Sequence, residues 1–361
     1  MIFTNQRGVS KGTFSQHELL GRFQAVSNSV QVPVGFWAAG LYNRWRKPGV
    51  GMWDSMMAEC FVEEEGKGKE NGESVDGDGG KKKKWEGRID LGKCFYVGDA
   101  AGRCKSGVRR KKDWSDSDKK FAINIGIEFY TPEEFFEGRK KGSEKFVLSG
   151  FNPRKDLVLG DDQGGKDIIF GGDDKDMKEV FKGIIRPKEV GESLLEEIEN
   201  ERQCLVLLVG FPASGKSTMT QRFLEPFGFV RVNNDTLRSK ARCLKLTRDS
   251  LQEGRSVVVD NTNPRPDSRK PYIDIALAHN PEMPIFCIVM DTSREIAEHL
   301  NVYRSRITND PNLHIPTVAY HTFALHFTEP TLKEGITKIG KAKFMPQFLT
   351  YDHYKEFLQL S

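Results

Sequence analysis

CLVLLVGFPASGKST, residues 204–218, is the stretch that decides the fold of this chain. Its first six residues form a continuous apolar run, which is typical of a strand buried on both faces of a parallel sheet. The next eight residues fit the phosphate-binding pattern G-x-x-x-x-G-K-[ST] and follow the strand directly, which is the context this pattern needs. A turn rich in small residues is the alternative interpretation, and the strand argues against it. The stretch therefore predicts a nucleotide-binding P-loop.

The chemistry of a P-loop explains its residue types. Glycines let backbone N–H groups turn toward phosphate oxygens, and the helix that follows adds positive potential at its N-terminus. Lys216 can reach the β- and γ-phosphates, and the Ser217 hydroxyl can complete the shell of a Mg²⁺ ion. We therefore expect ATP or GTP, with Mg²⁺, at this loop. The expected nucleotide-binding residues are Gly210, Ala213, Ser214, Gly215, Lys216, Ser217 and Thr218.

Three more apolar runs follow the P-loop, with helical patterns between them. They are FVRV (residues 229–232), SVVVD (residues 256–260) and IFCIVMD (residues 285–291). Alternation of this kind predicts an α/β domain with a parallel sheet that binds its ligands at the carboxyl ends of the strands.

Polar residues follow these strands. Asp235 is placed to accept a proton from an attacking hydroxyl, or alternatively to cap the next helix. Asp260 is placed to hold Mg²⁺ through water, or alternatively to be a strand-end residue with internal partners. Arginines 294, 304 and 306 are either part of a mobile lid over the transferring phosphate or surface residues. The pattern by itself leaves these choices open.

Composition sets the class of protein. With 361 residues, the chain is long enough for two domains, and 37% hydrophobic with 29% charged residues is typical of a polar globular protein. The net charge of +4 is a weak argument for an anionic partner. No apolar run approaches the ~20 residues of a membrane span, so we expect no membrane partner. The six cysteines form no C-x-x-C pair, which favours reduced thiols over disulfides or zinc.

Biased stretches divide the chain. Residues 63–84 combine glycine and charge with few apolar side chains, which predicts a disordered insertion. Their KKKK ending (residues 81–84) is a nuclear import signal or a solvated run, and RRKK (residues 109–112) is a solvated face or a nucleic-acid patch. Residues 159–176 have a similar bias. The expected organisation is a first domain over residues 1–155, a linker over 156–195 and a kinase domain over 196–361.

The motifs of the second half together resemble the kinase domain of the polynucleotide kinase 3′-phosphatase family, over residues 204–344. The resemblance rests on VGFPASGKST, VNNDTL, DNTNPRPDSR, HIPTVAYHTF and TEPTLKEGITKI. It implies that Asp235 activates a 5′-hydroxyl and that Lys216 and Ser217 bind phosphate and Mg²⁺. It also implies that Asp260 is the acidic group of the third strand and Arg304 the lid arginine. Asn234 departs from the family, which commonly has Arg before the catalytic Asp.

The first half resembles the phosphatase domain of the same family, a Rossmannoid fold of the haloacid dehalogenase superfamily. The motifs are FTNQRG, RWRKPGVGMWD, FYVGDAAGR, KKDWSDSDKKFAINIGIEFYTPEEFF and GFNPR. The resemblance implies that Thr4, Asn5 and Lys47 bind the substrate phosphate and that Asp99 helps to hold Mg²⁺. It also implies that at least one aspartate of DWSDSD supports the metal; taken alone, Asp113, Asp116 and Asp118 form a capping and turn cluster.

In this superfamily, a D-x-D-G-T loop upstream of FTNQ supplies the nucleophile and the general acid. The chain contains no such loop; DGDGG (residues 76–80) and GDD (residues 160–162) lie in biased sequence. The expectation is an N-terminally truncated form of a longer bifunctional enzyme, with impaired phosphatase activity. Because a central strand would be missing, residues 1–155 expressed alone are expected to be poorly stable, and a cooperative unfolding transition would contradict this.

The function expected from all these features is an ATP-dependent polynucleotide 5′-hydroxyl kinase. Its expected setting is the repair of DNA strand breaks in the nucleus, as a monomer that acts on DNA ends and contacts repair scaffold proteins. One alternative is an active kinase and 3′-phosphatase with a longer N-terminus. A small-molecule P-loop kinase leaves FTNQ, GDAAGR and TPEEFF unexplained. A nucleic-acid-binding module without catalysis leaves Lys216 and Asp235 idle.

Overall fold

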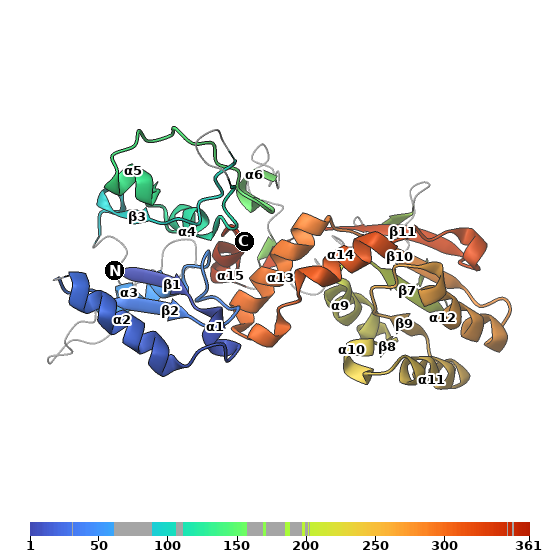
Figure 1. Cartoon of the computed structure of the whole chain (residues 1–361). Helices are drawn as coiled ribbons and strands as arrows, with labels where there is room; N and C mark the ends of the chain where they lie inside the picture. Colours follow the sequence, from blue (N-terminus) through green and yellow to red (C-terminus); the bar gives the residue numbers. More distant parts are fainter. Residues whose placement is uncertain are drawn as a thin grey trace, which may run out of the picture. The chain divides into compact units, whose positions relative to one another are not determined.

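The fold is described from a computed structural model (Figure 1). It covers residues 1–30, 32–60, 89–105, 111–156, 169–170, 185–187, 197–198, 201, 203–344, 346–348 and 350–361. The expected insertion at residues 63–84 and most of the expected linker lie outside these ranges. The chain forms two compact units, each described here by itself. The first comprises Met1–Asp167, Asn301–His314 and Phe348–Ser361, and the second comprises Ile168–Leu300 and Ile315–Gln347.

The second unit is built on a six-stranded sheet with the order β6-β11-β10-β7-β9-β8. The four predicted strands are confirmed as β7 (Leu205–Val209), β8 (Val230–Val232), β9 (Val257–Val259) and β10 (Ile285–Asp291), and they pair in parallel. Two further strands were not predicted. β11 (Lys338–Lys343) pairs in parallel with β10, and β6 (Ile185–Pro187), inside the expected linker, pairs antiparallel with β11.

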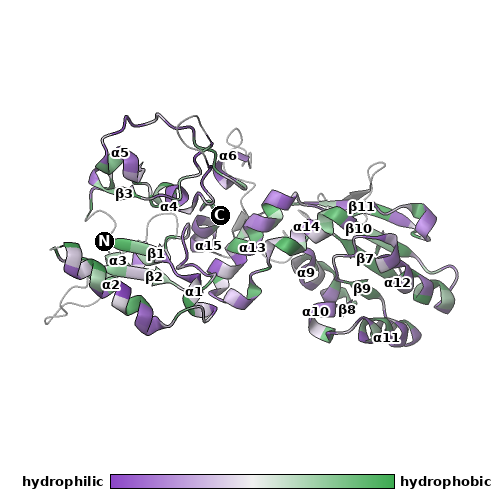
Figure 2. Cartoon of the chain, in the orientation of Figure 1, coloured by the Kyte–Doolittle hydropathy of each residue, from purple (hydrophilic) through white to green (hydrophobic). Residues whose placement is uncertain are grey.

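The continuous apolar run of β7 is explained by burial on both faces of the sheet. Leu205, Leu207 and Val209 belong to one core cluster, whereas Val206 and Leu208 belong to the cluster on the other face. Every residue of β7 is buried, and Figure 2 shows the central strands as hydrophobic. Because successive side chains of a strand point to opposite faces, a strand covered on both sides must be apolar throughout.

The helical segments of the second unit connect these strands. No helix in the described part of the chain is long and apolar enough to cross a membrane. The segments are α9 (Lys216–Met219), η3 (Thr220–Leu224), η4 (Glu225–Phe227), α10 (Asn234–Leu237), α11 (Lys240–Gln252), α12 (Pro266–His279), the first part of α13 (Arg294–Thr308), α14 (Thr317–His326) and η6 (Leu332–Glu334).

A buried ion pair ties α12 to η6. Arg269 is fully buried, and its Nε and Nη2 donate to the two carboxylate oxygens of Glu334 at 2.8 Å each. Its Nη1 donates to the carbonyls of Asn263, at 3.0 Å, and Thr328, at 3.2 Å. Asn263 in turn donates through Nδ2 to the Leu208 carbonyl of β7, at 2.8 Å. The Arg269–Glu334 ion pair therefore holds the loop that contains Asn263 beside strand β7.

Replacing Glu334 by Gln is expected to destabilise the second unit by about 3 kcal/mol, because it leaves the buried Arg269 charge uncompensated. Hydrogen exchange of the β7 and β10 amides in the full chain measures this, since those amides report the opening of the unit. Glu282→Gln, at an exposed position, is the matched control and should leave exchange unchanged. Equal exchange in both variants would contradict the prediction.

The first unit contains two small parallel sheets. β1 (Ile2–Asn5) pairs with β2 (Phe36–Ala39), and β3 (Phe95–Val97) pairs with β4 (Glu128–Tyr130). One core cluster, which includes Phe3, Trp53 and Phe121, joins them. The helical segments are α1 (Arg7–Ser10), α2 (Gln16–Val30), α3 (Gly51–Cys60), η1 (Leu91–Lys93), α4 (Ser117–Ile125), α5 (Pro132–Phe136) and α6 (Pro153–Asp156).

Two later segments of the chain also belong to the first unit. They carry the end of α13, η5 (Pro311–Leu313), part of β12 (Gln347–Phe348, which pairs with β5, Ile169–Phe170) and α15 (Tyr351–Phe357). Asn124 exchanges hydrogen bonds with Leu360, whose N–H donates at 2.7 Å and whose carbonyl accepts at 3.1 Å. The compact units therefore do not follow the boundaries expected at residues 155 and 196, because contacts distant in sequence join these segments to the first unit.

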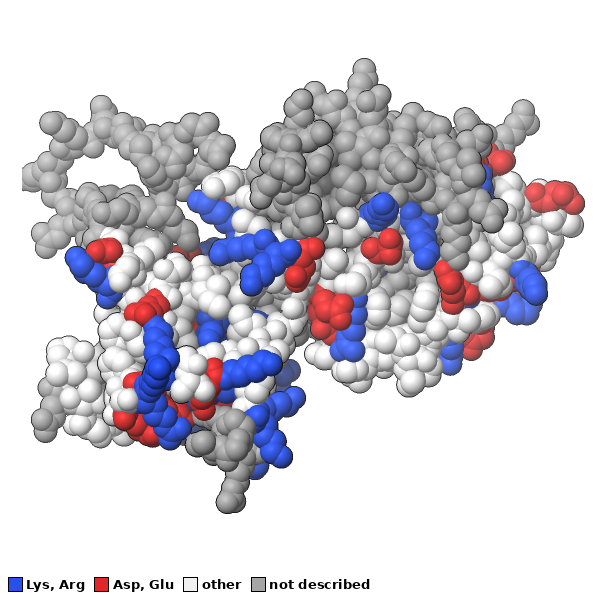
Figure 3. Space-filling model, turned by 90° about the horizontal axis from the view of Figure 1, so that it is seen from above, with Lys and Arg blue, Asp and Glu red and all other residues white. Residues whose placement is uncertain are grey.

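Charges of both signs are mixed on the described surface. On the face drawn in Figure 3, Lys and Arg side chains are interspersed with Asp and Glu. This agrees with the small net charge of +4. Recognition of an anion therefore depends on local groups more than on the field of the whole molecule.

Candidate active site

The P-loop of the second unit has the backbone that its sequence predicts. The loop follows β7 and ends at Gly215, whose φ of 94° lies in the left-handed region that glycine adopts without strain. Lys216 then begins α9, so the first N–H groups of the helix face the end of the strand. The Ser214 carbonyl accepts a hydrogen bond from Thr292 Oγ1 at 3.2 Å, which ties the loop to the end of β10.

Lys216 is held by the loop that precedes it. Its Nζ donates to the carbonyls of Gly210, at 3.0 Å, and Phe211, at 2.6 Å, and lies 3.3 Å from Ser214 Oγ. Burial lowers the pKa of Lys216 to about 8, although Asp260 and Asp235 favour the charged form. Both carboxylates are thus close enough to act on this ammonium group.

The affinity for ATP is expected to fall as the pH rises above about 8, the pKa of Lys216 without nucleotide. Bound phosphates favour the ammonium form and raise this pKa, so binding above pH 8 requires proton uptake and weakens about tenfold per pH unit. Calorimetric titration with ATP between pH 7 and pH 9.5 measures this. Lys216→Arg, which stays charged, should flatten the profile; a flat wild-type profile would contradict the prediction.

Asp260 lies at the end of β9 and is buried. Its Oδ2 accepts from Arg231 Nε at 2.8 Å and Nη2 at 2.6 Å, and its backbone carbonyl accepts from Asn233 Nδ2 at 2.6 Å. Its Oδ1 is buried and has no hydrogen-bond partner. An unpartnered buried carboxylate oxygen fits a water of a Mg²⁺ shell, and the Ser217 hydroxyl fits a direct ligand.

Asp235 lies in the first turn of α10 and is exposed. The cap of that helix is Asn233, whose Oδ1 accepts from the Thr236 N–H at 3.1 Å. The capping alternative for Asp235 is therefore wrong, and its carboxylate is available to a ligand. Asn234, where the family commonly has Arg, donates its N–H to Asn261 Oδ1 at 2.9 Å.

Arg304 is grouped with the first compact unit. It donates to the Leu313 carbonyl at 2.5 Å and lies 3.4 Å from Asn301 Oδ1. Its role as the lid arginine stays a prediction.

A second cluster of predicted site residues lies in the first unit, around Lys47. Lys47 is buried, and its Nζ donates to the Phe3 carbonyl and Tyr96 Oη, both at 2.9 Å, and to Asp118 Oδ1 at 2.5 Å. Asn5 joins the cluster by exchanging two hydrogen bonds with the Lys47 backbone, at 2.9 and 3.1 Å. The ammonium of Lys47 thus satisfies a carbonyl on the open edge of β1.

Thr4, the other predicted phosphate ligand, accepts through Oγ1 from Gln6 Nε2 at 2.7 Å. Asp99 follows β3 with an exposed side chain. The neighbouring Gly98 is required by packing, because a Cβ there would lie 2.6 Å from the Asp118 side chain. The structure therefore brings Thr4, Asn5 and Lys47 to one strand end, beside Asp118.

The three aspartates of DWSDSD have different surroundings. Asp113 accepts from the Arg103 N–H and Nε, and Asp116 accepts from Ser149 and pairs with Lys120 at 3.1 Å. Asp118 faces Lys47 and accepts from the Ala100 N–H at 3.1 Å. Asp113 and Asp116 are thus structural residues, and Asp118 is the candidate metal ligand of the three. In the described residues no group of three or more His, Cys, Asp or Glu side chains forms a complete metal site.

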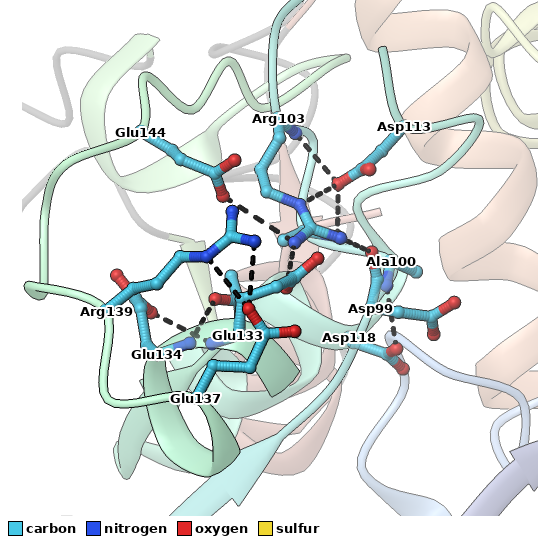
Figure 4. A network of polar contacts seen from close by, with 12 residues as sticks. Asp99, Ala100, Arg103, Asp113, Asp118, Glu133, Glu134, Glu137, Arg139 and Glu144 are labelled. Atoms are coloured by element: carbon cyan, nitrogen blue, oxygen red, sulfur yellow. Dashed lines mark hydrogen bonds and ion pairs between the residues drawn. The ribbon is translucent and has the colours of Figure 1, made fainter. Parts of the chain in front are cut away.

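Arg103 is a positioning residue that the sequence did not single out (Figure 4). It is buried and pairs with Asp113 at 2.9 Å, Glu133 at 2.6 Å and Glu144 at 3.6 Å. Its Nη2 donates to the Asp99 carbonyl at 2.9 Å, so the network fixes the loop that carries Asp99. Tyr96 was also missed, and its pKa is raised by burial and by Asp118, which keeps the hydroxyl protonated.

Comparisons with known proteins match both halves. The family model of "Polynucleotide kinase 3 phosphatase" covers residues 1–75 and 79–136, and an AAA domain model covers residues 205–317. The bifunctional polynucleotide phosphatase/kinase of Schizosaccharomyces pombe is 34% identical over 344 residues, which is 95% of this chain and 68% of that protein. The chain belongs to the bifunctional polynucleotide phosphatase/kinase family. The resemblance stated from the sequence motifs is thereby confirmed, as are the expected fold class and the P-loop kinase domain.

Two further curated proteins are similar to this chain as well. The putative bifunctional polynucleotide phosphatase/kinase of Acanthamoeba polyphaga mimivirus is 29% identical over 95% of this chain and 75% of its own length. The polynucleotide 3′-phosphatase of Saccharomyces cerevisiae is 54% identical over 50 residues, which is 14% of this chain and 18% of that protein. The similarities to the Schizosaccharomyces pombe and mimivirus proteins extend over both compact units.

Proposed function

We propose that the second unit transfers the γ-phosphoryl group of ATP to the 5′-hydroxyl of a polynucleotide. The observation that carries this proposal is the joint placement of Lys216, Asp235 and Asp260. They follow β7, β8 and β9, which are neighbours in the order β7-β9-β8 and run parallel, so the three side chains lie at the same edge of the sheet. Ligands of parallel sheets bind at that edge.

Each residue has one role in the proposed reaction. Asp235 accepts the proton of the 5′-hydroxyl, whose oxygen attacks the γ-phosphorus while the bond to the ADP oxygen breaks. Lys216 and the N–H groups of the P-loop bind the phosphates and their growing negative charge. The Ser217 hydroxyl and, through water, Asp260 Oδ1 would hold Mg²⁺, which would neutralise phosphate charge. Arg231 orients the Asp260 carboxylate through its two hydrogen bonds.

For the first unit we propose binding of a 3′-phosphate. Lys47, Thr4 and Asn5 supply the cation and polar groups that a phosphate needs, with Asp99 and Asp118 beside a Mg²⁺ ion. The covalent step of the superfamily needs an aspartate nucleophile, and the 361 residues contain no D-x-D-G-T loop to supply it. The candidate alternative is an active 3′-phosphatase in a polypeptide that includes such a loop.

The biological setting is part of the proposal. Ends that carry a 5′-hydroxyl and a 3′-phosphate arise at strand breaks, so a kinase for them suits DNA repair in the nucleus. The family membership and the lysine run at residues 81–84 support this setting. We also propose that the protein is a monomer and that it binds repair scaffold proteins.

A nicked duplex with a 5′-hydroxyl and a 3′-phosphate tests both halves in one reaction with ATP and Mg²⁺. Mass spectrometry of the separated strands should show a gain of one phosphoryl group at the 5′ end and an unchanged 3′-phosphate. A 5′ end that stays unmodified would refute the kinase proposal. Loss of the 3′-phosphate would show that another residue of the chain replaces the missing aspartates.

A further inference from the structure

A small pocket within the first unit is lined in part by Lys47, whose ammonium group donates to Phe3, Tyr96 and Asp118. Its volume is about 90 Å³. A water molecule occupies about 30 Å³ in the liquid, so the space suits a few waters or one small ion, and it is too small for a nucleoside. Its lining residues include Tyr42, Arg46, Lys47, Arg306, His314 and Ser361. We call this the Arg46–Arg306 pocket.

The two arginines of the pocket have buried nitrogens without partners. Arg306 is only 3% exposed; its Nη2 donates to the Leu360 carbonyl at 3.1 Å, but its Nη1 has no hydrogen-bond partner. Nη1 of Arg46 is likewise buried without a partner. Neither guanidinium has an ion pair with a carboxylate among the described residues. Leaving guanidinium nitrogens buried and unsatisfied is costly, so a missing acceptor is indicated.

More positive charge surrounds the same pocket. The guanidinium carbons of Arg7 and Arg46 each lie 4.5 Å from the ring centre of Tyr42, and Arg7 donates to Tyr42 Oη at 3.0 Å. The His314 ring stacks on Tyr42, with 4.2 Å between centroids and an interplanar angle of 4°. Stacking on the Tyr42 ring holds Arg7 and Arg46 in place, and the hydrogen bond to Tyr42 Oη adds to this for Arg7, although the two positive charges repel each other. The arrangement therefore favours a bound anion.

The pKa values point the same way. Burial lowers the pKa of Arg306 to about 10, although Glu356 favours its charged form. Burial lowers the pKa of Arg46 against the opposing effect of Tyr42, and the neighbouring Arg7 lowers it further. Burial and then Arg7, Arg46 and Arg304 lower the pKa of His314. Each shift means that the local environment disfavours positive charge, and an anion in the pocket would reverse that effect.

We propose that the Arg46–Arg306 pocket binds one phosphate group, with the Nη1 atoms of Arg46 and Arg306 as donors. Guanidinium groups match the oxygens of a tetrahedral phosphate in charge and geometry. This phosphate group is either free inorganic phosphate or a phosphodiester of a nucleic-acid strand. The inference goes beyond the proposed catalytic function, because no step of the kinase reaction or of 3′-phosphate binding uses these donors.

NMR of the histidine side chains in the full-length chain tests the proposal, with His314 as the reporter and His321, beside Arg294 in the second unit, as an internal reference. The His314 signals are assigned by their loss in His314→Gln. Inorganic phosphate should shift the His314 signals in the wild type. Arg46→Met should weaken that response about tenfold or more, Arg46→Lys should weaken it less, and Arg22→Met, at an exposed position, should leave it unchanged.

Oligonucleotides with hydroxyl groups at both ends separate the two sources. If a strand phosphodiester is the ligand, a natural oligonucleotide shifts His314 at lower concentration than phosphate does, and its uncharged methylphosphonate counterpart does not. If free phosphate is the ligand, only phosphate shifts His314. The proposal is overturned if neither probe moves the signal, if the response survives in Arg46→Met, or if the uncharged strand acts like the charged one. The NMR experiment measures binding of phosphate or strand in the first unit. A negative result there would therefore not bear on the outcome of the kinase assay.

Discussion

Lys216→Met is expected to lower kcat for 5′-phosphorylation by about 10²–10³-fold, because it removes the buried cation that we propose binds the transferring phosphate. Met has nearly the same length and leaves no buried charge. The carbonyls of Gly210 and Phe211 lose their donor, so a modest loss of stability accompanies the loss of activity. The measurement is single-turnover transfer of labelled phosphate from saturating ATP to a 5′-hydroxyl strand.

The control for this variant is Lys240→Met, at an exposed position at the start of α11, which should keep full activity. Calorimetry at saturating ATP and circular dichroism establish that the Lys216→Met protein is folded and loaded. A folded, ATP-loaded Lys216→Met protein with kcat within threefold of wild type would exclude Lys216 from the transition state.

Asp235→Asn is expected to lower kcat by about 10³-fold while the affinity for ATP and for the strand stays nearly the same. An amide cannot accept the proton of the attacking hydroxyl, and general base catalysis contributes about 10²–10⁴-fold. Asp235 is exposed and does not cap α10, so its replacement should leave the thermal midpoint unchanged. The readout is kcat at saturating ATP and strand, measured beside the affinities for both, and kcat alone should fall.

Asp249→Asn on α11 is the matched control for Asp235→Asn, because it removes one exposed carboxylate that forms an ion pair with Lys245 in the same helix. If both variants behave alike, the effect at Asp235 is one of net charge. If Asp235→Asn loses strand affinity and keeps kcat, the residue orients the substrate and another group accepts the proton.

Local patterns in the sequence were sufficient to predict the central strands and the P-loop of the second unit. The run from Cys204 to Ser217 contains both its strand and its loop, so no distant contact was needed to identify either. β11 was missed because KIGKAK mixes lysine with small residues, and its strand state depends on pairing with β10. β6 was missed for a similar reason, since three residues provide no periodicity.

Long-range partners explain the other misses. Leu360 pairs with Asn124, 236 positions away, and no local pattern signals such a contact. Arg231 pairs with Asp260 because Val232 and Val259 are opposite each other in the sheet, and that register is not visible in the sequence. The sequence did not decide whether Asp235 is a general base or a helix cap, because both roles use an aspartate at this position after the strand. Only the position of Asn233 decided against the cap.

The division of the chain into segments has a consequence for any attempt to take the enzyme apart. The backbone passes from one compact unit to the other four times, after Asp167, Leu300, His314 and Gln347. A single protease cut, gene fission or plasmid truncation therefore cannot release either unit whole. Recombination that swaps only a front or a back half between relatives would break both units at once.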